Sequence, residues 1–216
     1  MSERSQQRGS LKGEVYILTR EEYTMNQEKL SVPSNEEMEA VFKQSQNIYE
    51  QEQSHYEAIA KEKPELAPLF GITPEIHPLP YPVPVVRTTE YVSGYFNINT
   101  YHQIGSYPFI QVSSYPVLIG NNPYPRRNAN FNGYIYGGYN MPQINFNNIY
   151  LSGVIHHTNT IINTPLNFQL FIYPQKIHLR LFKGNVYLGD LISVHQHNIL
   201  VTYPIVFSGV GNFNFV

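Results

Sequence analysis

The best candidates for a chemically active site in this sequence are histidines at the spacing of metal ligands. His195 and His197 flank Gln196, and a β-strand would place both imidazoles on one face, about 6.6 Å apart along it. His178 lies on a neighbouring predicted strand. Three converging imidazoles would suit zinc or another divalent ion, whereas separate ones would be hydrogen-bonded surface or interface residues. We favour the second interpretation, and expect neither a metal nor another cofactor.

Carboxylates are too scarce in the C-terminal part for paired acid–base chemistry. Residues 87–216 contain Glu90 and Asp190 as their only acids. Glycoside hydrolysis needs two carboxyl groups placed across one bond, and a Ser-His-Asp triad would have to use Asp190. The GxSxG nucleophile motif is also missing from the sequence. We therefore expect no catalytic residues and no enzymatic activity.

A Tyr/Asn-rich stretch, YPRRNANFNGYIYGGYNMPQINFNN at 124–148, has the composition of a sugar-binding surface. Aromatic faces can stack on pyranose rings, and Asn amides can both donate to and accept from hydroxyl groups. Tyr134, Tyr136 and Tyr139 are the candidate glycan contacts. Contacts between protein subunits use the same residue types, because Tyr gives a large contact area at a small entropy loss. Subunit contact is the favoured interpretation.

A long amphipathic helix is predicted for residues 35–62. Ser34 and Glu37 have the spacing of a capping box, and neither Gly nor Pro interrupts the segment. Apolar residues at three- and four-residue spacing form a stripe that includes Phe42, Tyr49 and Tyr56. The stripe would dock either on the chain's own β domain or on a neighbouring subunit. As interface residues, these three would anchor the helix in a groove.

A proline-rich segment, 64–86, follows the helix. It contains seven of the sixteen prolines, four of them alternating in HPLPYPVPVV. Alternation removes the N–H donors along one edge of an extended chain, so the segment can pair with a sheet only through its other edge. It is either a rigid linker or a terminating strand on a neighbour, with interface candidates Leu79, Tyr81, Val83 and Val85. The predicted organisation is an arm at 1–63, an extended linker at 64–86 and a β domain at 87–216.

The β domain shows the period-two alternation of half-buried strands. Predicted strands cover 91–99, 107–119, 130–137, 144–156, 166–173, 176–182, 186–194, 198–207 and 210–216, and Gly184-Asn185 predicts a hairpin turn. Helical periodicity does not interrupt them, so parallel βαβ units are not expected. The predicted fold is mainly β, an antiparallel β-sandwich of jelly-roll type, with an immunoglobulin-like sandwich as the alternative.

Charge is divided unevenly along the chain. Residues 1–86 carry 8 Lys/Arg and 14 Asp/Glu, whereas the 130 residues of 87–216 carry six and two, about 6% of that segment against roughly 25% in ordinary globular proteins. A domain with so little charge is expected to cover part of its surface with a partner. A single basic pair, Arg126-Arg127, argues against nucleic acid as a partner, since a clustered basic stripe is expected for that role. The polar N-terminal sequence argues against a cleaved secretory signal, and no apolar run reaches the ~18 residues of a membrane-spanning helix.

An arm, a proline spacer and a nearly uncharged β domain make a layout that resembles single jelly-roll structural proteins of virus particles. The resemblance implies a self-assembling capsid or virion subunit. Its partners would be copies of itself, in a homo-oligomer or lattice whose arms contact neighbouring subunits, and other virion proteins, and it would be assembled in the host cytoplasm. The alternative is a carbohydrate-binding adhesin or fibre-tip domain on a helical stalk. A third class, a metal-dependent cupin-like enzyme, requires His178, His195 and His197 to converge.

Overall fold

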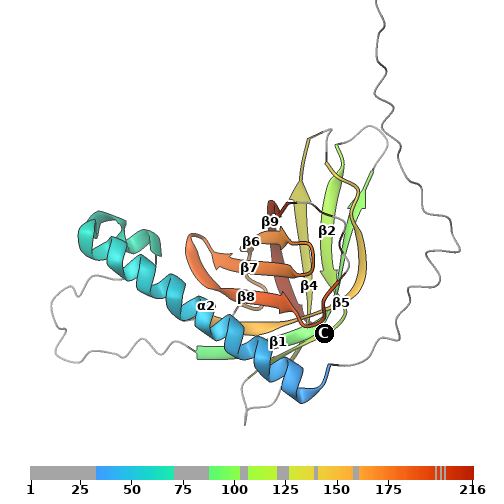
Figure 1. Cartoon of the computed structure of the whole chain (residues 1–216). Helices are drawn as coiled ribbons and strands as arrows, with labels where there is room; N and C mark the ends of the chain where they lie inside the picture. Colours follow the sequence, from blue (N-terminus) through green and yellow to red (C-terminus); the bar gives the residue numbers. More distant parts are fainter. Residues whose placement is uncertain are drawn as a thin grey trace, which may run out of the picture. The chain divides into compact units, whose positions relative to one another are not determined.

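The computed structural model describes residues 33–70, 88–102, 107–120, 127–138, 141–157, 161–197, 199, 201 and 203–216, which lie in one compact unit, Pro33–Val216. These residues form one α-helix, one 3₁₀ helix and nine strands (Figure 1). Their bounds are α2 Asn35–Glu62, η1 Pro64–Phe70, β1 Thr88–Tyr101, β2 Phe109–Ser114, β3 Val117–Gly120, β4 Arg127–Tyr136, β5 Asn145–His157, β6 Leu166–Ile172, β7 Ile177–Lys183, β8 Val186–Ser193 and β9 Ile205–Phe215.

Helix α2 begins and ends where the sequence predicts. The Glu37 backbone N–H donates to Ser34 Oγ at 3.2 Å, and the Ser34 N–H donates to Glu37 Oε2 at 2.8 Å, so the capping box is complete. The helix ends at Glu62, two residues before Pro64, whose ring cannot continue it. Within the described residues, no helix has the length and apolar character needed to cross a membrane.

The strands form an antiparallel barrel, and the predicted β-sandwich is wrong. The strand order around the barrel is β1, β2 with β3, β4, β9, β6, β7, β8 and β5. The barrel closes because β5 also pairs with β1. Because β2 and β3 both lie between β1 and β4, the barrel has eight strand positions. Neither a jelly roll nor an immunoglobulin-like sandwich closes in this way. Closure removes the open sheet edges that a sandwich would have to protect.

Closure depends on two long strands, β1 with 14 residues and β5 with 13. They pair from Thr88↔His157 to Asn99↔Asn145, with a register shift between Phe96 and Ile98. In β5 the chain takes a left-handed conformation at Asn148, with φ of 58°, and the Asn148 N–H donates to Asn97 Oδ1 at 2.9 Å. An extra residue of this kind bends its strand and increases the local twist.

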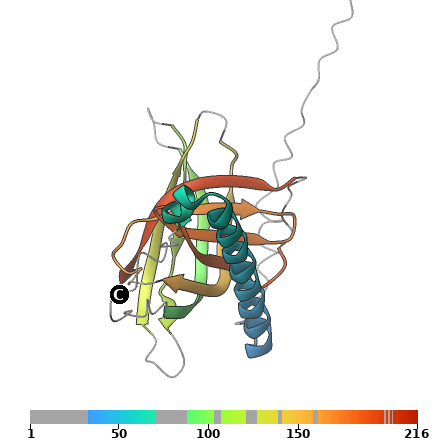
Figure 2. The ribbon, with the colours of Figure 1, turned by 90° about the vertical axis from the view of Figure 1, so that its left-hand side faces the viewer.

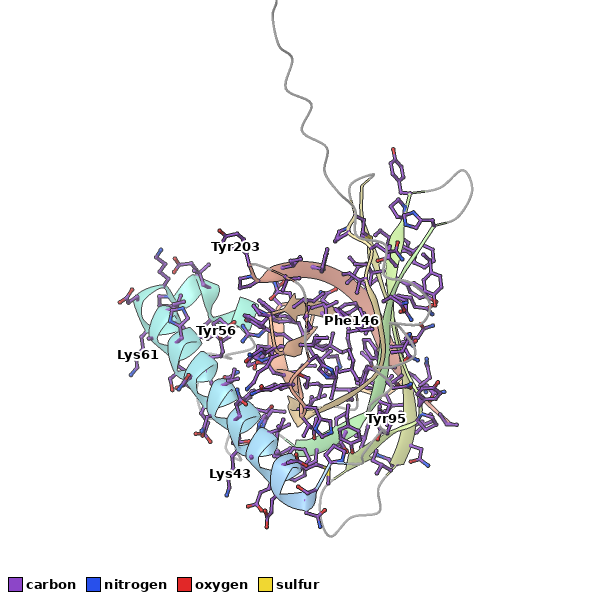
Figure 3. The ribbon with its side chains drawn as sticks, turned by 45° about the vertical axis from the view of Figure 1, so that its right-hand side comes forward. Lys43, Tyr56, Lys61, Tyr95, Phe146 and Tyr203 are labelled. Carbon is purple, nitrogen blue, oxygen red and sulfur yellow. The ribbon has the colours of Figure 1, made fainter. Side chains whose placement is uncertain are left out.

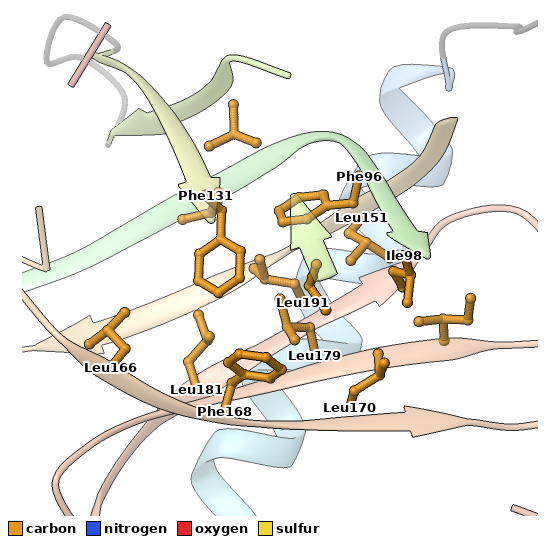
Figure 4. Close-up of a cluster of buried hydrophobic side chains, with 14 of the residues drawn as sticks. Phe96, Ile98, Phe131, Leu151, Leu166, Phe168, Leu170, Leu179, Leu181 and Leu191 are labelled. Atoms are coloured by element: carbon orange, nitrogen blue, oxygen red, sulfur yellow. The ribbon is translucent and has the colours of Figure 1, made fainter. Parts of the chain in front are cut away.

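Alternate side chains of every strand fill the barrel interior. Figure 4 shows aromatic and branched side chains from opposite walls meeting there, among them Phe96, Phe131 and Phe168. The hairpin between β7 and β8 turns at Gly184 and Asn185, as predicted. Three strand predictions needed correction. The predicted strand 107–119 breaks at Tyr115 and Pro116 into β2 and β3, and the predicted strands 198–207 and 210–216 both contribute to a single strand, β9.

Helix α2 lies against the outside of the barrel over β5 and β8 (Figures 1 and 2). Lys43 and Lys61 project from the side of α2 that faces away from the strands, and Tyr56 lies on the near side (Figure 3). Of the two docking modes left open by the sequence, the described structure has the helix on its own β domain. The arm predicted at 1–63 therefore includes a helix that belongs to the same compact unit as the barrel.

Candidate functional site

The best candidate site is an uncharged surface on the outside of the barrel, across β1, β2, β4 and β9. We call it the amide–aromatic face. Its side chains alternate along each strand with buried interior residues, so they point away from the core. It consists of Asn97, Asn99, Tyr101, Phe109, Gln111, Ser113, Asn130, Asn132, Tyr134, Tyr136, Asn212 and Asn214.

One end of this face is a cluster of aromatic rings. Tyr101 is paired with Phe109 across β1 and β2, and Phe109 is paired with Tyr136 across β2 and β4. The Tyr101 and Phe109 ring centroids are 5.6 Å apart, and those of Tyr134 and Tyr136 are 6.3 Å apart. Tyr101 is 43% exposed and Tyr136 76% exposed. Large ring surfaces are therefore held against one another and remain accessible to solvent.

Side-chain amides order the rest of the face. Gln111 Nε2 donates to Asn132 Oδ1 at 3.1 Å, and Asn132 Nδ2 donates to the Tyr134 hydroxyl at 3.1 Å. A second pair joins Asn212 Nδ2 to Asn214 Oδ1 at 2.7 Å. Each amide carries two donor hydrogens and an acceptor oxygen with two lone pairs, so one such bond leaves further capacity. The face can accept from and donate to hydroxyl groups, and its rings can stack.

A second polar cluster, the helix–barrel seam, lies between α2 and strands β5, β7 and β8. Arg180 Nε and Nη2 donate to the two carboxylate oxygens of Asp190 at 3.0 and 3.3 Å, and Arg180 Nη1 donates to Glu52 on α2 at 3.1 Å. Ser45 Oγ donates to the Asp190 carbonyl at 2.7 Å and accepts from the Val154 N–H at 3.0 Å. The seam thus ties the helix to two paired strands.

Electrostatics in the seam favour fixed protonation states. Burial alone would lower the pKa of Arg180, but the hydrogen bonds and charge of Asp190, together with Tyr187 and the charge of Glu52, outweigh it and raise that pKa. Burial raises the pKa of the Tyr187 hydroxyl, and the Asp190 carboxylate raises it further. Asp190 is fully buried. The other acid of the β domain, Glu90, forms an ion pair with Arg127. This arrangement suits structural ion pairs.

The predicted interface residues of the helix lie at or near the seam. Tyr49 is buried, and its ring stacks on His156 with a centroid distance of 3.7 Å. Phe42 meets Tyr91 of β1 edge-on at 4.7 Å. Tyr56 is half-buried, and burial followed by the charge of Glu52 raises the pKa of its hydroxyl. The remaining predicted contacts, Leu79, Tyr81, Val83, Val85 and Tyr139, lie outside the described residues.

The three candidate metal ligands lie in different settings. His178 is on β7, where burial lowers the pKa of its imidazole and its ring is 5.1 Å from that of Tyr173. The sequence predicted that His195 and His197 share one face of a strand. This prediction is wrong, because both residues follow the end of β8 at Ser193. His195 Nδ1 lies 4.0 Å from Glu37 Oε1. Across the described ranges, no three His, Asp or Glu side chains come together to hold a metal ion.

Tyr134 and Tyr136, predicted as glycan contacts, lie in the aromatic cluster. Their partners Tyr101 and Phe109 were not predicted, because they lie outside the 124–148 stretch and join it only through strand pairing. The signal that could have added them was the alternation of outward- and inward-facing residues in 91–99, continued by two residues to Tyr101, and in 107–119. Comparison of the chain with protein-family models, curated proteins and solved structures finds no match.

Proposed function

We propose that the protein is a non-catalytic binding protein whose amide–aromatic face binds neutral carbohydrate. The observation that carries this proposal is the set of stacked, solvent-accessible rings, which continues into ordered Asn and Gln amides without a charged side chain. Sugar rings present apolar C–H faces and hydroxyl edges, and this face offers a counterpart for each. Because internal hydrogen bonds already orient several amides, less conformational freedom is lost on binding.

The test is isothermal titration of the full chain with cellohexaose, mannohexaose and chitohexaose. Tyr136→Ala removes the most exposed ring of the cluster and should weaken binding by about 2- to 12-fold, the equivalent of one aromatic contact. Tyr203→Ala is the matched control, since Tyr203 is 78% exposed but outside the face. Equal loss in both variants, or no binding of any hexasaccharide by the unaltered chain, would refute the proposal.

A second candidate is the self-assembling structural subunit, such as a virion component assembled in a host cytoplasm. The observation in its favour is the outer row of β9, where Val206 and Val210 are 51% and 52% exposed on a nearly uncharged surface. The docking of α2 on its own barrel leaves the proline-rich segment as the predicted contact with neighbours. Light scattering of the full chain tests this proposal: large particles that shrink in Val206→Ser would support it, and a concentration-independent monomer would exclude it.

A further inference from the structure

A hollow of about 460 Å³ lies on the outside of the barrel, where β6 and β9 meet the hairpin between β7 and β8. Its lining contains no charged residue and consists of Asn167, Phe168, Gln169, Phe182, Gly184, Asn185, Ser208, Gly209 and Val210. The volume lies within the range of about 300–1,000 Å³ that is usual for small-molecule sites. The outward-facing Phe182 ring and several amides therefore border a space that a small neutral molecule can enter.

The wall of the hollow is held in place by the hairpin turn. Gly184 takes the left-handed conformation, with φ of 61°, that the first position of a two-residue turn requires. Asn167 Nδ2 donates to the Gly184 carbonyl at 3.0 Å and ties the turn to β6. The Phe182 ring lies 5.8 Å from that of Tyr187, which is buried beneath α2. The hairpin turn, its hydrogen bond to β6 and the ring contact of Phe182 thus hold the wall of the hollow in place.

Strand register connects the hollow with the amide–aromatic face. Phe182 is paired with Asn167, Asn167 with Val210, and Val210 with Tyr134. Tyr134 is paired in turn with Gln111. These outward-facing residues form one row across five neighbouring strands, β7, β6, β9, β4 and β2. Four strand spacings give the row a length of about 19 Å.

We propose that the hollow is an end subsite for a linear, neutral oligosaccharide whose following units lie along this row on the amide–aromatic face. The inference rests on the proposed function and adds to it the shape of the ligand. A terminal sugar would stack on Phe182 and exchange hydrogen bonds with the side chains of Gln169, Asn185 and Ser208. The next units would cross Val210 to reach Tyr134. A ligand of several linked units fits a row of this length, and the uncharged lining favours a neutral one.

Chain-length dependence tests this assignment. The full chain is titrated with cellohexaose, mannohexaose and chitohexaose, and with the disaccharides cellobiose, mannobiose and chitobiose. In the unaltered chain a hexasaccharide should bind more tightly than its disaccharide. The double variant Gln169→Ala/Asn185→Ala should lose about tenfold in hexasaccharide affinity, the equivalent of two hydrogen bonds, and should change disaccharide affinity on the aromatic cluster by less than about twofold.

Ser208→Ala, which removes one exposed hydroxyl of the lining, is the second variant. It should lower hexasaccharide affinity a few-fold and leave disaccharide affinity unchanged. Unfolding in urea checks that each variant keeps the stability of the unaltered chain. If a hexasaccharide binds and weakens with Tyr136→Ala but not with either hollow variant, the end subsite is overturned and the proposed function stands. If no hexasaccharide binds the unaltered chain, both proposals are overturned.

Discussion

Arg180 is the residue on which the helix–barrel seam depends, because it contacts a buried acid on β8 and an acid on α2. A carboxylate as deeply buried as Asp190 is strongly unfavourable unless it is paired and hydrogen-bonded. Arg180 provides two parallel hydrogen bonds, the geometry in which guanidinium and carboxylate groups bind most strongly. Its guanidinium also lies over the Tyr187 ring, 5.1 Å from the centroid.

Asp190→Asn should therefore lower the free energy of unfolding by about 3–5 kcal/mol, because it leaves the Arg180 cation without its buried partner. Glu52→Gln alters the other, more accessible ion pair of Arg180 and should lower the free energy of unfolding by less than about 1 kcal/mol. Urea unfolding followed by circular dichroism measures both. Similar losses in the two variants would show that Asp190 has no special role in the seam.

Ser45 makes the other contact between the helix and the paired strands. Ser45→Ala would leave the Val154 N–H without this acceptor and the Asp190 carbonyl without this donor, so we expect a loss of about 1–3 kcal/mol in unfolding free energy. Ser54→Ala is the control: the exposed Ser54 hydroxyl donates only within its own helix, to the Glu50 carbonyl, and its loss should change stability by less than about 0.5 kcal/mol. If Ser54→Ala is as destabilising as Ser45→Ala, the hydrogen bonds of Ser45 to the paired strands do not make the expected contribution to stability.

His178 should make stability depend on pH. Burial lowers the pKa of its imidazole in the folded chain below the ordinary 6.5. Between the folded and unfolded pKa values the unfolded chain binds more protons, so the free energy of unfolding falls as pH drops below about 6.5 and is unaffected by this group above it. Urea unfolding at about pH 7.5 and about pH 5.5 should show a smaller difference in His178→Gln than in the unaltered chain. An equal difference would remove His178 as the cause.

At the scale of the elements, the closure of the barrel rests on the bulged pairing of β1 with β5. Asn148 is suited to its left-handed conformation, because Asn adopts that region more readily than other residues with a side chain. A β-branched residue there is strained by about 1–3 kcal/mol. Asn148→Val should lower the midpoint of thermal unfolding by several degrees, whereas Asn148→Gly should not. Equal midpoints for the Val and Gly variants would contradict the role of the bulge.

Local patterns explain why some elements could be predicted and others could not. The capping box at Ser34 and Glu37 and the Pro64 stop act within a few residues, so both ends of α2 could be predicted from the sequence. Alternation places the same residues inside a sandwich or a barrel, since both bury one face of each strand. The choice between them depends on the β1–β5 pairing, which joins Thr88 to His157 and has no local signal.

The candidate site, like the fold, could be predicted only where its residues lie close together in the sequence. Tyr134 and Tyr136 could be selected because they lie in one Tyr/Asn-rich stretch. The complete aromatic cluster could not be predicted, because Tyr101 and Phe109 reach it through the register of β1 with β2 and of β2 with β4. The hollow could not be predicted from the sequence either, because β6 and β9 are adjacent strands of the barrel but are far apart in the chain.

At the scale of the described unit, the charged surface and the proposed binding surface are separated. Acidic and basic residues of α2 point to solvent on one side, as Lys43 and Glu39 do in their exposed ion pair, whereas the amide–aromatic face carries no charge. Charged surface keeps a molecule dispersed, and the uncharged face is left available for a neutral partner. This separation predicts how binding responds to salt.

Affinity for a bound neutral hexasaccharide should change by less than about twofold between about 0.05 M and about 0.5 M NaCl, because no charged pair is there to be screened. A charged partner steered to the same face by the basic residues of the barrel would lose affinity steeply over that range. Titrating heparin beside cellohexaose, mannohexaose and chitohexaose at both salt concentrations separates the cases. Tight, salt-sensitive heparin binding with no neutral hexasaccharide bound would transfer recognition from the amides and rings to basic residues outside the face.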